Sequence, residues 1–284
     1  MIYVSSSCVQ SEKIGRSVNT LAQQGYKNIE LSGGTQPYAS LENDLLELQA
    51  KYDLNYLCHN YFPPPSKDFV LNLASLNQET AQLSLDQVRS ALRLSEKLGS
   101  KKYAFHAGFL IDIPLLQVGK SVEKREMFDA QLAIEQFKKN AQTISDEFPQ
   151  VDLYVENNVI SNRNYLNYDR FNPFFLTSSA GLSLLDGLSD YKPLIDVAHL
   201  KVSANTLGLD LEGELDDFMM RTDYIHISDN NGLADTNGPF KESGELFDLL
   251  SKYDYKNKTI TLEVYAHEDE LRSSFENANR LMYG

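Results

Sequence analysis

The chain has 284 residues, of which 42% are hydrophobic and 23% are charged, as is ordinary for a globular protein. No stretch approaches the roughly eighteen consecutive apolar residues that a membrane helix needs. The N-terminus also lacks the basic and apolar regions of a signal peptide. We therefore expect no membrane partner. The two cysteines, Cys8 and Cys58, fit a reducing compartment, so the default prediction is a cytoplasmic protein.

The balance of charges argues against a protein that grips nucleic acid. The chain has 26 basic and 40 acidic residues, a formal net charge of −14. Duplex binding usually requires Lys and Arg to be concentrated on one surface, but here Lys101-Lys102 and Lys138-Lys139 are isolated pairs. We expect a small-molecule partner and no nucleic acid. Self-association into a homo-oligomer stays open.

Short apolar runs alternate with longer amphipathic segments over the whole chain. The eight predicted strands are Ile2–Ser5, Asn28–Leu31, Tyr56–His59, Tyr103–His106, Val151–Glu156, Pro193–Asp196, Tyr224–Ile227 and Ile260–Glu263. The segments predicted to be helical are Lys13–Gln24, Leu41–Tyr52, Gln78–Leu98, Lys124–Glu147, a polar stretch ending near Leu188, a segment inside Ala204–Met220, Glu242–Tyr253 and Glu268–Met282. Strands that alternate with helices favour parallel pairing, and eight repeats are typical of a (β/α)₈ TIM barrel. We expect one such domain over residues 1–284.

The spacing of apolar residues supports the helices. Ala81, Leu85, Val88 and Leu92 recur at steps of three and four, as on one face of a helix. A doubly wound open sheet is the alternative architecture. Its usual G-x-G-x-x-G motif does not follow the first predicted strand, which favours the barrel.

Polar side chains mark the carboxyl ends of six predicted strands. They are His59, His106, Glu156, Asp196, His226 and Glu263. Active sites of parallel barrels lie at this end. In Val151–Glu156 the aliphatic residues share one face, so Glu156 is expected on the opposite face, pointing into the barrel.

Such a cluster needs positive charge near it. Burying one unpaired carboxylate or imidazole is costly, and six at one end would repel each other or stay unsatisfied. Mixed Asp, Glu and His ligands suit Mn²⁺, Mg²⁺, Co²⁺, Fe²⁺ or Zn²⁺. The sequence therefore predicts a divalent metal as cofactor.

Several short motifs also resemble a known family. They are Cys58-His59-Asn60-Tyr61, Phe69–Ser75, Phe105-His106-Ala107-Gly108, Val155-Glu156-Asn157-Asn158, Asp196-Val197-Ala198-His199, His226-Ile227-Ser228-Asp229 and Leu262-Glu263. In this order they look like the motifs of the xylose-isomerase-like superfamily, which holds sugar and sugar-phosphate isomerases and epimerases, and endonuclease IV. The resemblance runs from about the third strand to the last.

The resemblance implies a role for each strand-end residue. It makes Glu156, Asp196, His226 and Glu263 the metal ligands. Substrate contacts would come from His59, His106 and His199. His199 would instead hold a second metal in an endonuclease-like site.

Two features depart from the family's patterns. Endonuclease IV has an Asp-x-His motif where this chain has Asp235-Thr236-Asn237, so its last histidine is missing. The epimerases often have an arginine where Asn230-Asn231-Gly232 supplies none. Asp235 fits a turn and a metal site equally well. Glu30 lies near the end of the second strand, and we expect it to make a structural hydrogen bond rather than to contact a substrate hydroxyl.

Taken together, the residues and the resemblance predict a metal-dependent isomerase or epimerase for a sugar, a sugar phosphate or a keto-polyol. Glu156 and Glu263 would be the catalytic residues that remove and return a proton beside a carbonyl. The alternatives are a related dehydratase, an endonuclease-IV-like phosphodiesterase for abasic DNA, and a sugar-binding barrel without turnover. The phosphodiesterase would use His59, His106, His199 and Asp235 as further metal ligands.

Overall fold

The computed structural model describes all 284 residues. Eight parallel strands form a closed barrel in their sequence order: β1 (Ile2–Ser5), β2 (Asn28–Leu31), β3 (Asn55–His59), β4 (Lys102–His106), β5 (Asp152–Glu156), β6 (Tyr191–Asp196), β7 (Tyr224–Ile227) and β8 (Thr259–Leu262). The barrel closes where Ile2 of β1 pairs with Ile260 of β8. The predicted TIM barrel is confirmed, and every predicted strand is present with bounds shifted by at most two residues.

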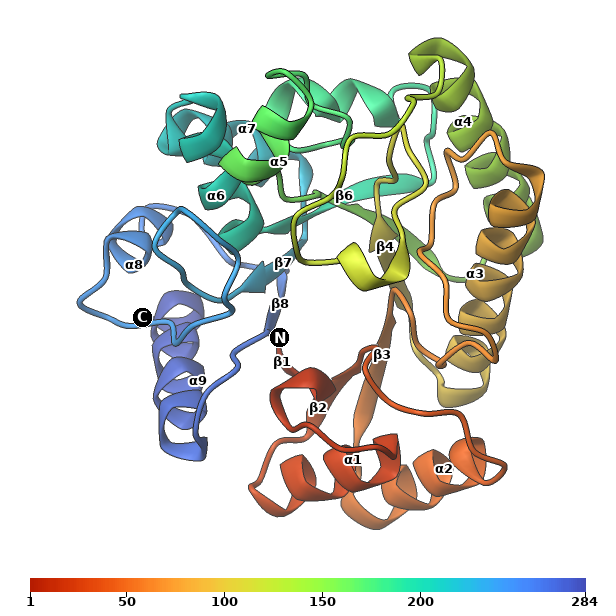
Figure 1. Cartoon of the computed structure of the whole chain (residues 1–284). Helices are drawn as coiled ribbons and strands as arrows, with labels where there is room; N and C mark the ends of the chain where they lie inside the picture. The colour runs from red at the N-terminus through yellow and green to blue at the C-terminus, as the bar shows by residue number, and fades with distance from the viewer.

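Helices surround the strands (Figure 1). They are α1 (Ile14–Gln23), α2 (Leu41–Tyr52), α3 (Gln78–Leu98), α4 (Ala130–Glu147), α5 (Asn162–Asn167), α6 (Val197–Leu207), α7 (Leu211–Arg221), α8 (Glu245–Leu250) and α9 (Glu268–Tyr283), with short 3₁₀ turns at Ser6–Cys8, Leu115–Gln117 and Ser179–Leu185. The two chain ends meet, because the Met1 amino group lies 3.2 Å from the Met282 sulfur. None of these helices combines the length and apolarity needed to cross a bilayer.

The predicted helices differ from the observed ones in three places, one of which is α8, where Glu245–Leu250 is helical rather than Glu242–Tyr253. Helix α4 begins at Ala130, six residues later than predicted, because the Asp129 carboxylate accepts a hydrogen bond from the Leu132 backbone and starts the helix there. The helix predicted inside Ala204–Met220 is α7, and a further helix that was not predicted, α6, precedes it. Gly208, with φ of +69°, ends α6, and Asp210 caps the start of α7.

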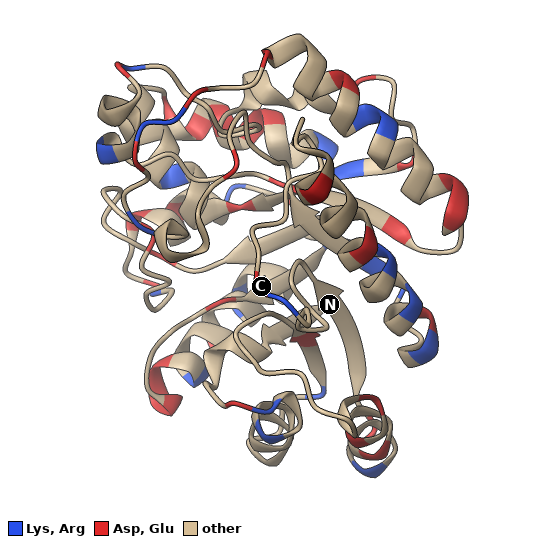
Figure 2. Ribbon diagram, turned by 45° about the vertical axis from the view of Figure 1, so that its right-hand side comes forward, with Lys and Arg blue, Asp and Glu red and all other residues tan.

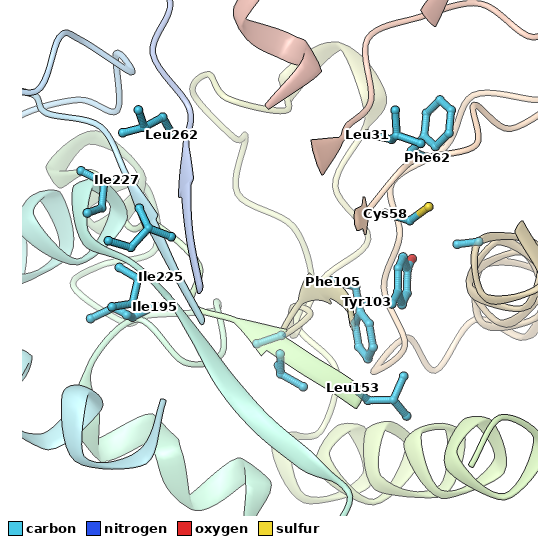
Figure 3. Close-up of a cluster of buried hydrophobic side chains, with 14 of the residues drawn as sticks. Leu31, Cys58, Phe62, Tyr103, Phe105, Leu153, Ile195, Ile225, Ile227 and Leu262 are labelled. Carbon is cyan, nitrogen blue, oxygen red and sulfur yellow. The ribbon is translucent and has the colours of Figure 1, made fainter. Parts of the chain in front are cut away.

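Outward-facing strand residues form the main hydrophobic core against the helices. In Figure 3 the labelled side chains of β3, β4 and β7, among them Cys58, Tyr103 and Ile227, point away from the centre of the barrel. A smaller apolar layer fills the inside, made of Tyr3, Leu57, Ala104, Tyr154, Leu194 and Tyr224. Because side chains alternate along each strand, the next inward positions toward the carboxyl ends are the polar strand-end residues.

Candidate metal centre

The strand-end residues converge above the inner apolar layer. Register places His106 of β4 beside Glu156 of β5, and Asp196 of β6 beside His226 of β7. His59 comes from β3, and Glu263 directly follows β8. The structure thus brings all six predicted side chains to one mouth of the barrel, at the end where TIM-barrel active sites lie.

Glu156 is at the middle of this group. Its Oε2 atom lies 3.1 Å from His59 Nε2 and 3.4 Å from His106 Nδ1. Its Oε1 atom lies 3.6 Å from His226 Nδ1. On the other side, His226 Nδ1 lies 3.7 Å from Glu263 Oε2. One carboxylate therefore joins the histidines of β3 and β4 to the residues of β7 and β8.

Two atoms of the cluster lack a hydrogen-bond partner. Asp196 Oδ2 and His226 Nδ1 are buried and make no hydrogen bond. Buried polar atoms of this kind normally find a partner. Metal–ligand bonds to N or O atoms are about 2.0–2.2 Å long, so ligand atoms that share an ion lie roughly 3–4 Å apart. The residues present fit a divalent cation.

The ligand atoms form overlapping groups. Asp196, His226 and Glu263 make one, in which the three donor atoms lie within 4.8 Å of one another. A second is His59, His106 and Glu156, by the same measure. A third group, Glu156, Asp196 and His199, shares Asp196 with the first and Glu156 with the second, so the four residues proposed as metal ligands form one connected set. The fourth group is Glu30, His59 and His226. His59 and His106, predicted to contact substrate, could therefore themselves hold a metal.

Asp196 uses its two oxygens differently. Oδ1 accepts a hydrogen bond of 2.7 Å from the His199 backbone and caps the start of α6. Oδ2 is the atom without a partner. The same side chain therefore begins a helix and still offers one free oxygen to the cluster.

Two further carboxylates belong to the site. Glu30 of β2 is fully buried and lies 3.1 Å from His226 Nε2, in keeping with the predicted structural hydrogen bond. Asp235, left open by the sequence, lies with its Oδ2 atom 3.2 Å from His199 Nε2. His199 Nδ1 lies 3.0 Å from the Asn157 carbonyl oxygen, so the imidazole is held on both sides.

The surroundings of the cluster give its carboxyl groups different pKa values. Burial raises the pKa of Glu263 to about 7, and the carboxylates of Glu30 and Glu156 add to this, against the opposing effect of His226. Burial also raises the pKa of Asp196, to about 6. For Glu156 burial acts in the same direction, but His106, His59 and His226 outweigh it and hold its pKa well below the usual range.

The cluster forms the floor of a cavity of about 1260 Å³. Glu263 and His106 reach it with 12% and 25% of their side chains exposed, whereas Glu156 is 1% exposed and His226 is fully buried. Ser6, Ser32, Gly33 and Asn60 also line the cavity, and Lys120 and Arg163 are the two Lys or Arg residues in the lining. Of the two proposed catalytic carboxylates, Glu263 is thus the one better exposed to a bound substrate, and Asp235, 22% exposed, lines the same cavity.

Charged residues elsewhere are mixed rather than segregated. Figure 2 shows Lys and Arg interspersed with Asp and Glu along the helices and loops. Within this view no continuous basic stripe leads to the barrel.

Solved structures with the same architecture include sugar epimerases and an endonuclease. A D-tagatose 3-epimerase-like protein superimposes with a TM-score of 0.72 at 17% identity, over 99% of this chain and 96% of that one. D-psicose 3-epimerase from Clostridium cellulolyticum gives 0.64 at 12% identity, over 99% and 97%. Endonuclease IV from Thermus thermophilus gives 0.61 at 14% identity, over 98% and 99%. At these identities the likeness concerns the fold.

Sequence comparison gives the family. The uncharacterized protein MJ1614 of Methanocaldococcus jannaschii is 24% identical over 231 residues, which cover 76% of each chain. Residues 18–281 match the family described as xylose isomerase-like TIM barrel. This match covers nearly the whole barrel and its strand-end cluster. The chain therefore belongs to the xylose isomerase-like TIM barrel family.

Proposed function

We propose that this protein is a metal-dependent isomerase or epimerase acting on a sugar, a sugar phosphate or a keto-polyol. One observation carries the proposal: Glu156 and Glu263, which come from different strands, each lie within 3.7 Å of the unpartnered and buried His226 Nδ1. The similarity to sugar 3-epimerases supports the same class of reaction. A cytoplasmic location stays part of the proposal.

The proposed cation would be held by Glu156, Asp196, His226 and Glu263. Once bound, it supplies the positive charge that favours ionisation of a carbon beside a carbonyl. Glu263, which reaches the cavity, accepts the proton from this carbon at its carboxylate. Glu156, which comes from a different strand, would return a proton to the carbon. It would first take this proton from His59, whose Nε2 lies 3.1 Å from Glu156 Oε2. The proton held by Glu263 would pass to solvent in the cavity, and His59 would regain one from solvent.

The histidines orient the substrate. His106 and His199 both line the cavity, and each can donate to or accept from a hydroxyl group. His59 lies deeper, with 7% of its side chain exposed, and holds Glu156 in place. Positioning of this kind keeps the reacting carbon near the two carboxylates.

A second possible metal site favours one of the alternative functions, the phosphodiesterase. His59, His106 and Glu156 could bind a further metal, as a phosphodiesterase for abasic DNA would require. Charge weighs against this function, because Lys120 and Arg163 are the two cationic residues in the lining and duplex binding depends on many phosphate contacts. We keep the phosphodiesterase as the second candidate.

The experiment is proton exchange in heavy water. The metal-loaded protein is incubated in D₂O with a panel of sugars and sugar phosphates. We expect deuterium beside the carbonyl of at least one compound, no exchange with Glu263→Gln, and full exchange with the exposed control Glu276→Gln. Exchange with loss of water would identify the dehydratase. Sugar binding without exchange, or metal-dependent cleavage of abasic DNA without exchange, would contradict the proposal.

A further inference from the structure

We propose that Glu30 is a positioning residue for the metal centre: its Oε2 atom fixes the orientation and tautomer of His226, so that Nδ1 faces the ion. This inference rests on the proposed metal site. It assigns a task to the carboxylate on β2, a strand that contributes none of the proposed ligands.

Glu30 is the meeting point of three hydrogen-bonding groups from two other strands. Its Oε2 atom accepts hydrogen bonds from the Tyr224 hydroxyl and, at 3.1 Å, from the Thr261 hydroxyl. The same oxygen lies 3.1 Å from His226 Nε2. Glu30 has no exposed surface, so water does not compete for these bonds.

The two nitrogens of His226 face different surroundings. Nε2 faces Glu30, whereas Nδ1 has no hydrogen-bond partner and faces Glu156 and Glu263. A neutral histidine carries its proton on one nitrogen and a lone pair on the other. With the proton on Nε2, bonded to Glu30, the lone pair of Nδ1 points into the cluster. Carboxylates commonly orient metal-binding histidines in this way.

Contacts of Tyr224 with the inner apolar layer also fix the position of Glu30. The Tyr224 ring packs edge-to-face against Tyr154, with ring centroids 5.2 Å apart, and the Lys102 ammonium lies 5.3 Å from the centre of the Tyr224 ring. The inner apolar layer thus fixes the tyrosine whose hydroxyl holds Glu30. Glu30 Oε2, which faces His226, already accepts hydrogen bonds from two hydroxyl groups and therefore suits an orienting acceptor. The other oxygen, Oε1, is buried without a hydrogen-bond partner, and Glu30, His59 and His226 themselves form one of the groups that could hold a metal.

Substitution of Glu30 tests the inference through metal affinity. Glu30→Gln keeps the size of the side chain but removes its charge, and the amide can donate to Nε2 and turn the proton of His226 toward the cluster. We expect the dissociation constant for Mn²⁺, measured by calorimetric titration, to rise about 10- to 100-fold. The matched control is Thr261→Val, which removes a donor from the same oxygen and leaves His226 bonded to Glu30. It should change the affinity far less.

A second measurement uses the unsubstituted protein, so it does not depend on the folding of a variant. Histidine is labelled with ¹⁵N, Zn²⁺ is added as a diamagnetic probe, and long-range ¹H–¹⁵N spectra are recorded. We expect His226 to carry its proton on Nε2 and the metal on Nδ1. Metal on Nε2, or equal Mn²⁺ affinities for Glu30→Gln and the unsubstituted protein, would overturn the role of Glu30 alone. If the unsubstituted protein bound no metal, the proposed function would fail with it.

Discussion

At the scale of single residues, Asp196 shows how one carboxylate can serve structure and chemistry together. Its Oδ1 atom caps α6 through the His199 backbone, and its Oδ2 atom lies free in the cluster. A cap needs only an acceptor oxygen, whereas binding a cation benefits from negative charge. The two tasks can therefore be separated by a substitution that keeps the acceptor and removes the charge.

Asp196→Asn is that substitution. We expect the variant to keep its thermal stability without metal, because the amide oxygen still accepts the bond from the His199 backbone. Its Mn²⁺ affinity should fall by at least tenfold, since a charged ligand has become neutral. Melting curves of the metal-free protein and calorimetric titration of Mn²⁺ measure the two effects.

The matched control is Asp210→Asn on the next helix. Asp210 caps α7 through the Gly213 backbone and belongs to no ligand group. The Asp210→Asn substitution should leave the Mn²⁺ affinity unchanged. If Asp196→Asn bound Mn²⁺ as tightly as this control, Asp196 would be a cap and nothing more.

Sequence alone predicted the members of the cluster better than their contacts. Glu156 and Glu263 could be placed because alternation along a strand decides which residues face the barrel interior. For Glu30 the sequence predicted only a structural hydrogen bond. Its carboxylate pairs with His226, nearly 200 residues away in the chain, and no local pattern indicates such a contact between β2 and β7. Asp235 lies in the loop after β7, and a loop has no alternation from which the direction of a side chain could be predicted.

At the scale of elements, strands were easier to predict than helix starts. A buried strand is a short apolar run, and all eight were found. The start of α4 depends on one capping side chain, Asp129. The polar residues before Asp129 would also fit the first turn of a helix, so the sequence pattern alone does not mark the start. The division between α6 and α7 depends on the left-handed backbone of Gly208.

Helix α3 offers a test of capping. Asn77 Oδ1 accepts hydrogen bonds from the Glu79 and Thr80 backbones, at 2.9 and 3.2 Å. Asn77→Ala removes this acceptor and should lower the free energy of unfolding by about 1 kcal/mol, measured by urea denaturation. Asn77→Asp keeps an acceptor and should remain close to the unsubstituted protein. A similar loss with both variants would show that the cap oxygen is not responsible.

At the scale of the whole molecule, a second charged cluster closes the other end of the barrel. Asp223 accepts hydrogen bonds from Lys102 at 2.9 Å, Lys192 at 2.6 Å and the Tyr154 hydroxyl at 2.5 Å. Burial alone would raise the pKa of Asp223, but these three donors outweigh it and lower the pKa to about 2. The cluster ties β4, β5 and β6 to the start of β7.

The lowered pKa predicts a dependence of stability on pH. The folded chain holds the charged carboxylate better than the unfolded one, so the stabilisation is full above about pH 4 and is lost as pH falls toward 2. The shift corresponds to about 2 kcal/mol, and partial exposure of the side chain reduces this to about 1–2 kcal/mol.

Asp223→Asn measures this contribution. Urea denaturation at pH 7 should show the variant less stable by about 1–2 kcal/mol, and the difference should shrink as pH falls below 4. The exposed control Asp248→Asn should show no such trend. A difference that stayed constant down to pH 2 would mean that the charge of Asp223 contributes nothing to folding.

The opposite ends of the barrel thus handle charge in different ways. At the amino ends of the strands, Lys102 and Lys192 neutralise Asp223 within the protein. At the carboxyl ends, Asp196 Oδ2 and His226 Nδ1 make no hydrogen bond. This contrast is the reason to assign a cation to the carboxyl ends of the strands.

Metal content is the most direct measurement of this claim. The protein is stripped with chelator, reloaded with Mn²⁺ or Zn²⁺, freed of excess ion and analysed by mass spectrometry for metal per chain. We expect at least one tightly held cation per chain, and its loss in Glu156→Gln, which removes the charge of the carboxylate that two of the ligand groups share. A chain that retained no metal after reloading, or retained the same amount in Glu156→Gln, would contradict it.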